Sequence, residues 1–63
     1  MRGTLTKDGG QPVIVEHKFD GTYADVSRWV RANAPRPYTI ETVDRNQYRI
    51  TCDTGTFLLV VSQ

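Results

Sequence analysis

A small α+β domain, in which one helix packs on one face of an antiparallel sheet, is the fold class that the sequence predicts. Residues 38–43 and 47–52 alternate between apolar and polar side chains and are rich in strand-forming residues. Residues 56–62 form a continuous apolar run, which is typical of a central strand. A chain of 63 residues forms one domain, so we expect a single unit over residues 1–63 with the order β-β-α-β-β-β.

The first two strands are expected to form a hairpin. Residues 2–6 make the first strand, and Gly9-Gly10 favours a tight turn after it. Residues 12–19 follow as a longer strand, which can begin at a proline because a first position needs no ladder donor. Alternation places four side chains of that strand on one face: Val13, Val15, His17 and Phe19.

The only helix is expected between residues 22 and 34. Thr22 is the expected N-cap, and Asp25 three residues later comes close to the capping-box pattern. Pro35 and Pro37 disfavour helix just before them, so the helix should end near Asn33 or Ala34. Helical spacing aligns four residues along one side: Tyr23, Val26, Val30 and Asn33.

One short helix covers only one face of such a sheet, so the other face of the sheet should keep apolar side chains that the helix does not cover. The covered face should hold eight apolar side chains: Val15, Phe19, Ile40, Tyr48, Ile50, Phe57, Leu59 and Val61. Four more remain on the other face: Ile14, Val43, Leu58 and Val60. We expect this surplus to be covered by strong curling of the sheet, by a second copy of the chain or by a partner.

The charge balance and the cysteine count limit the classes of function that the protein can have. Eight basic and seven acidic residues leave a net charge of +1, which argues against a strongly electrostatic nucleic-acid binder and against an acidic DNA mimic. The first residues do not resemble a signal peptide, and the longest apolar run, residues 57–61, is too short to cross a membrane. A lone thiol suits a reducing compartment, so we expect a cytoplasmic protein without membrane contact.

The candidates for chemistry are few. His17 is the only histidine, and its neighbour Glu16 points to the opposite face of the expected strand, so we interpret His17 as structural. Cys52 ends an expected strand on the apolar face, where we interpret it as a small buried hydrophobe. One histidine and one cysteine do not complete a zinc site, and the aspartates show no metal-loop spacing. We therefore expect no catalytic residue, metal or cofactor.

An interaction surface is the preferred functional interpretation. Trp29 lies at the edge of the apolar stripe of the helix, with Arg28 and Arg31 nearby, and tryptophan and arginine are enriched among interface hot spots. Alternatively, Trp29 closes the rim of the core, and both interpretations stay open. The expected protein interface combines these three residues with the surplus apolar ones: Trp29, Arg28, Arg31, Leu58, Val60 and Ile14.

Nucleic-acid binding is the alternative function. Arg36, Arg45 and Arg49, together with aromatic residues, would form a small basic and aromatic surface. Tyr38 and Tyr48, however, fit the core face of their strands, and the net charge is close to zero. This alternative therefore ranks second.

Self-association is also expected, as a two-fold homodimer. Pairing through a two-fold axis would let the surplus apolar patch cover its own copy and would compensate for a small core.

In size and style the chain resembles the short proteins encoded by bacteriophages and prophages, which include small host-interaction proteins and inhibitors. The likeness lies in a strand–Gly-Gly–strand opening, one helix and three final strands. It implies a phage-encoded regulator or inhibitor of a host protein, and it carries over no functional residue.

Overall fold

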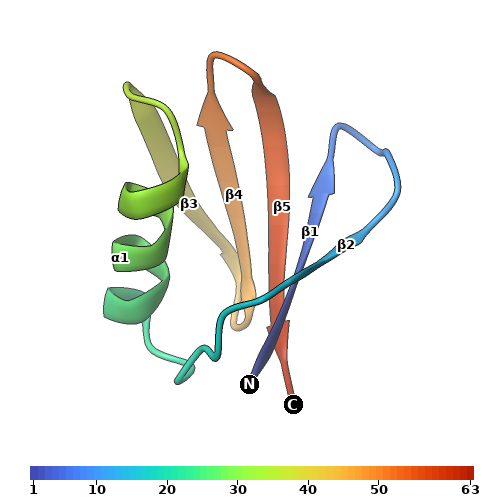
Figure 1. The fold of residues 1–63 in the computed structure, drawn as a ribbon, viewed down its shortest axis with the longest axis vertical. Helices are drawn as coiled ribbons and strands as arrows, with labels where there is room; N and C mark the ends of the chain where they lie inside the picture. Colours follow the sequence, from blue (N-terminus) through green and yellow to red (C-terminus); the bar gives the residue numbers. More distant parts are fainter.

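The computed structural model describes all of residues 1–63 as one five-stranded antiparallel sheet and one helix (Figure 1). The elements are β1 (Arg2–Lys7), β2 (Val13–Val15), α1 (Tyr23–Asn33), β3 (Tyr38–Asp44), β4 (Gln47–Cys52) and β5 (Gly55–Ser62). The strand order is β2-β1-β5-β4-β3. The structure confirms the predicted fold class, the order of the elements and the central position of the last strand.

The register of β5 decides which side chains share a face. Leu59 lies opposite Leu5 of β1 on one side and opposite Tyr48 of β4 on the other. Residues directly opposite each other in an antiparallel ladder point to the same face, so these three side chains lie on the face of the sheet against which α1 packs. We call this the inner face and the opposite one, which carries Leu58 and Val60, the outer face.

The helix begins and ends where the sequence predicts. Thr22 is the N-cap, and its Oγ1 accepts a hydrogen bond from the Asp25 N–H at 3.2 Å. The last turn closes with the Ala34 N–H donating to the Val30 carbonyl at 2.7 Å. This helix is 11 residues long, and the protein has no helix with the length and apolar character needed to cross a membrane.

The predicted apolar stripe of the helix is partly wrong. Val26 and Val30 are fully buried, but Tyr23 is 51% exposed and Asn33 is exposed. Asp25, by contrast, is buried because it turns toward the chain segment before the helix. The buried side of α1 is therefore narrower than the spacing indicates, and it includes one carboxylate that faces the preceding segment.

The second strand is shorter than predicted, three residues in place of residues 12–19. After Val15 the chain leaves the ladder and returns at Phe19, whose N–H donates to the Met1 carbonyl at 3.0 Å. The Phe19 ring then lies on the backbone of Gly3, where any Cβ would overlap it. Burial of this ring at a glycine decides the path of the segment more strongly than strand propensity does.

The core fills the inner face around α1. Seven apolar residues are buried there: Phe19, Val26, Val30, Tyr48, Ile50, Leu59 and Val61. Five of them were expected on the covered face, and the remaining three expected there, Val15, Ile40 and Phe57, are partly buried against the cluster. On the outer face, Leu58 and Val60 stay half-buried and Ile14 is 62% exposed, so the sheet does not curl enough to hide that face.

Candidate functional site

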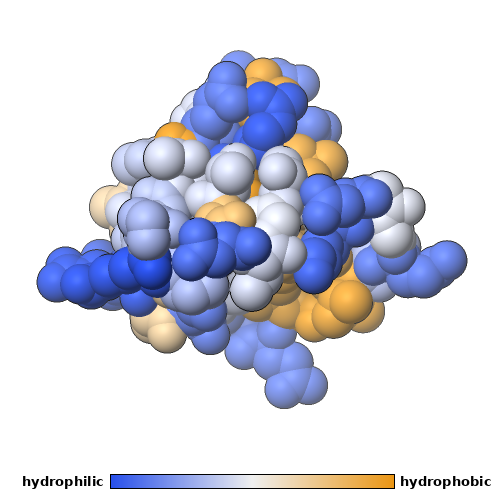
Figure 2. All heavy atoms as spheres, turned by 90° about the horizontal axis from the view of Figure 1, so that it is seen from above, coloured by the Kyte–Doolittle hydropathy of each residue, from blue (hydrophilic) through white to orange (hydrophobic).

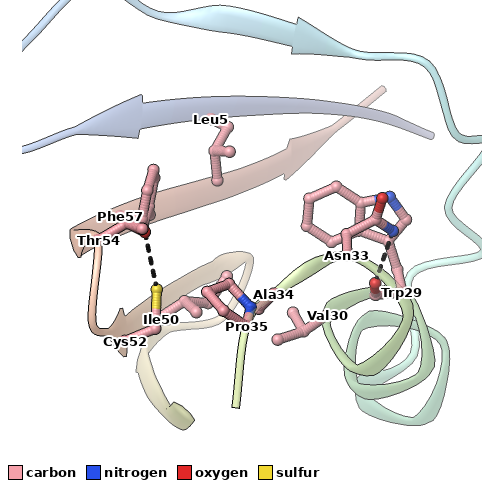
Figure 3. Close-up of a pocket in the computed structure, with 10 residues that line it drawn as sticks. All are labelled: Leu5, Trp29, Val30, Asn33, Ala34, Pro35, Ile50, Cys52, Thr54 and Phe57. Carbon is pink, nitrogen blue, oxygen red and sulfur yellow. Dashed lines mark hydrogen bonds between the residues drawn. The ribbon is translucent and has the colours of Figure 1, made fainter. Parts of the chain in front are cut away.

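An apolar groove lies between the C-terminal half of α1 and the inner face of the sheet (Figure 3). Its volume is about 310 Å³. The sheet contributes Leu5, Ile50, Cys52 and Phe57, the helix contributes Trp29, Val30 and Asn33, and the connecting segments contribute Ala34, Pro35 and Thr54. We call this feature the apolar groove.

The groove exists because the core fills only one end of the inner face. The Phe19 ring occupies the space over Gly3, at the start of β1. Leu5 and Phe57, farther along the same face, are only partly buried. The helix cannot extend over them, since it ends at Asn33 and Pro35 follows. Figure 2 looks down on the end of the molecule where α1 finishes, and its largest apolar area lies on the side away from the helix.

Trp29 forms one wall of the groove. Its ring packs edge-on against Phe19, with the ring centroids 5.7 Å apart, and the residue is half-buried. The two interpretations of this residue are therefore compatible in the structure, because Trp29 closes the rim of the core and also lines an open groove.

The polar groups of the groove are already engaged. The Asn33 side chain donates a hydrogen bond to the Trp29 carbonyl at 2.8 Å. The Cys52 sulfur lies 3.2 Å from the Thr54 hydroxyl and donates to the Gly55 carbonyl at 3.8 Å. Cys52 is half-buried, not fully buried as predicted, and no basic side chain lines the groove beside it. The groove therefore offers mainly apolar contact.

His17 has a carboxylate partner that the sequence did not reveal. Its Nε2 lies 3.3 Å from both carboxylate oxygens of Asp25, which also accepts the Asp20 N–H at 3.0 Å. Arg28 lies 3.6 Å from the same carboxylate, as its i,i+3 spacing predicts. This pair fastens the segment before α1 to its first turn. No group of three or more His, Cys, Asp or Glu side chains comes together where it could hold a metal ion.

The three arginines of the nucleic-acid alternative do not meet. Arg36 precedes β3, and Arg45 lies in the turn that follows the same strand. A seven-residue strand at ~3.3 Å per residue separates them by roughly 20 Å. Arg49 lies on the outer face, where it pairs with Glu41 of β3 at 2.6 Å.

The residues of the expected protein interface fall on different surfaces. Trp29 lines the apolar groove, and Arg28 lies over the carboxylate of Asp25. Leu58, Val60 and Ile14 lie on the outer face, because Val60 pairs with Thr4 and Thr4 with Ile14 across the sheet. Arg31 lies on the flank of α1 away from the groove.

On that flank the structure forms a second, open hollow between α1 and the start of β3. Its lining consists of Ser27, Arg31, Arg36, Pro37 and Tyr38. We call it the arginine hollow. The sequence assigned Arg31 and Arg36 to different surfaces, and only the return of the chain after the helix brings them together.

Comparison with known proteins finds no relative of this chain, since no family model, curated protein or solved structure matches it.

Proposed function

We propose that the protein is a non-enzymatic interaction module that binds a partner protein by receiving one of its apolar side chains in the apolar groove. The observation that carries the proposal is the groove itself, about 310 Å³ in volume and walled by Trp29, Leu5 and Phe57. Binding sites for small groups usually measure ~300–1,000 Å³, and this groove lies at the lower end of that range. A site of this size suits one anchoring side chain better than an extended ligand.

The character of the walls supports a protein partner. Tryptophan is enriched among interface residues that contribute most of the binding energy. The groove lies beside the buried core, and Trp29, Leu5 and Phe57 pack against that core, so a partner side chain would meet walls that are already formed and little ordering entropy would be lost. If the likeness to short phage proteins reflects its origin, the module would serve as a regulator or inhibitor of a host protein.

Nucleic-acid binding remains the second candidate. It has less support because Arg36 and Arg45 lie at opposite ends of β3 and Arg49 is paired with Glu41. An extended basic surface, which binding to phosphate backbones requires, is not assembled from these three residues.

A peptide-display selection tests the proposed function. A random library is selected on the wild-type protein, and the enriched peptides are then assayed on two variants, Asn33→Glu and Ala32→Glu. Asn33 lines the groove, whereas the neighbouring exposed Ala32 does not, so both changes add the same charge to the last turn of α1 but only one places it at the groove.

We expect the enriched peptides to share a large apolar or aromatic residue, and to bind the Ala32→Glu variant but not the Asn33→Glu variant. Urea unfolding of both variants checks that the fold is retained. Peptides that bind both variants equally would show that the groove is not the binding site, and the proposal would then be withdrawn.

A further inference from the structure

The two arginines of the arginine hollow, Arg31 and Arg36, form no ion pair within the protein. Arg28 pairs with Asp25 and Arg49 pairs with Glu41, but neither Arg31 nor Arg36 has a carboxylate partner. Both residues are exposed and line the same hollow, and no carboxylate belongs to its lining. Two like charges that face one concave surface raise the local positive potential, and a bound anion relieves their repulsion.

A structural role for these two arginines explains less of the arrangement. Arg31 lies in the last turn of α1, where a cation is favourable, but the Trp29 and Val30 carbonyls of that turn already have other donors. The Asn33 side chain donates to the Trp29 carbonyl and the Ala34 N–H donates to the Val30 carbonyl. These two carbonyls therefore do not depend on either guanidinium.

The hollow has further features of an oxyanion site. Arg36 stands between Pro35 and Pro37, whose rings restrict the backbone on either side of it. Ser27 and Tyr38, both half-buried, line the hollow and carry hydroxyl groups that are able to donate hydrogen bonds. Guanidinium groups bind carboxylates and phosphates with two parallel hydrogen bonds, which is the chemistry that this combination suits.

The hollow and the apolar groove are adjacent through one short segment. Ala34 and Pro35 line the groove, and the next two residues, Arg36 and Pro37, line the hollow. We propose that a partner segment lies across residues 34–37 and places an apolar side chain in the groove and an oxyanion, a carboxylate or a phosphate, in the arginine hollow. This inference rests on the proposed function, and it specifies the partner as an acidic or phosphorylated peptide segment.

A titration with small anions tests the hollow without the groove. Amide and arginine side-chain NMR signals of the wild type are followed during addition of inorganic phosphate and of phenyl phosphate, with sodium chloride at equal ionic strength as the control. We expect saturable shifts confined to the region of Ser27, Arg31, Arg36 and Tyr38. Shifts that are spread over all arginines, or that chloride reproduces, would overturn the assignment of an oxyanion site.

Two variants of equal charge make this test specific. The Arg31→Gln, Arg36→Gln variant should lose the saturable shifts. The Arg2→Gln, Arg45→Gln variant, which changes two exposed arginines elsewhere, should keep them. Equal loss in both would show a general charge effect and would overturn the proposal.

The peptide selection separates this inference from the proposed function. Peptides enriched on the wild type should carry Asp or Glu near their apolar anchor. Replacing that acidic residue by Gln should weaken binding, whereas replacing it by phosphoserine should retain binding. The loss with Gln should reach up to about fivefold, the range of exposed ion pairs. Selection on the Arg31→Gln, Arg36→Gln variant should retain the anchor and lose the acid.

Each failure has its own signature. Peptides that share an anchor without any acidic preference would overturn this inference and leave the proposed function standing. If no anchored peptide appears while the phosphate titration still identifies the hollow, the proposed function and the two-point partner both fail. Sub-micromolar binding of a labelled oligonucleotide that depends on Arg31 and Arg36 would assign the hollow to nucleic acid and overturn the peptide proposal.

Discussion

Leu58 and Leu59 are adjacent leucines on opposite faces of the central strand, and they provide a matched test of the fold. Leu59 is fully buried between Leu5 of β1 and Tyr48 of β4, whereas Leu58 is half-buried on the outer face. Truncation to alanine is the same chemical change at both sites. Any difference in stability between the two variants therefore reports their surroundings.

The structure sets the expected magnitudes. Leu59→Ala removes a fully buried side chain and leaves a cavity, which costs ~2–5 kcal/mol. Leu58→Ala should cost only about 1 kcal/mol, near the centre of measured substitutions. At ~0.05–0.15 kcal/mol per residue, the whole chain of 63 residues has roughly 3–9 kcal/mol of stability. At the middle of both ranges, loss of Leu59 should therefore remove about half of the stability.

Urea unfolding measured by Trp29 fluorescence is the direct assay, since Trp29 is the only tryptophan and contacts Phe19 in the core. With a slope of ~1 kcal/mol per M, the midpoint should fall by about 2–5 M for Leu59→Ala and about 1 M for Leu58→Ala. Circular dichroism should report the same midpoints if unfolding is two-state. Equal midpoint shifts in the two variants would refute the assignment of inner and outer faces.

Three further outcomes are expected. Two copies should associate through the outer face, so light scattering should exceed 7.1 kDa at high concentration for the wild type but not for Leu58→Glu, and a wild-type mass of 7.1 kDa throughout would contradict the dimer. Gly3→Ala should displace the Phe19 ring and lower the urea midpoint by ~1–3 M, since overpacking costs ~1–3 kcal/mol and the free energy of unfolding falls by ~1 kcal/mol per M urea. An unchanged midpoint would show that the ring does not lie on Gly3. Hydrogen bonds from the Thr22 hydroxyl and N–H hold the pKa of Asp20 below its ordinary value, so the ionised Asp20 side chain stabilises the fold at pH values above its unfolded-state pKa and this stabilisation is lost as the pH falls through its folded-state pKa. NMR titration of the Thr22→Val variant should show a higher pKa for Asp20, and an unchanged pKa would exclude the hydroxyl as the cause.

Most of the fold follows from short-range patterns in the chain. The boundaries of α1 depend on a threonine N-cap and on two prolines a few residues beyond its end, so a window of some 15 residues contains the whole signal. Strands β3, β4 and β5 follow from alternation and from one continuous apolar run. The outer-face position of Leu58 and the inner-face position of Leu59 follow from the same alternation.

Long-range contacts explain the features that were missed. β2 is short because Phe19 packs on Gly3, sixteen positions earlier in the chain. No local sequence pattern predicts that contact. Asp25 is buried because His17 returns to meet it, although alternation had assigned His17 to a strand face. Both misses arise where a loop, not a regular element, brings the partners together.

The candidate sites divide in the same way. The sequence by itself determined that Trp29 would lie at the edge of the apolar stripe and that one helix would leave part of a five-stranded sheet uncovered. Only the tertiary structure decided that the uncovered part of the inner face would become a groove, and that Arg31 would share a hollow with Arg36. The physical reason is one of range: propensity and periodicity act over a few residues, whereas a groove depends on how far an 11-residue helix reaches across strands that are distant in the chain.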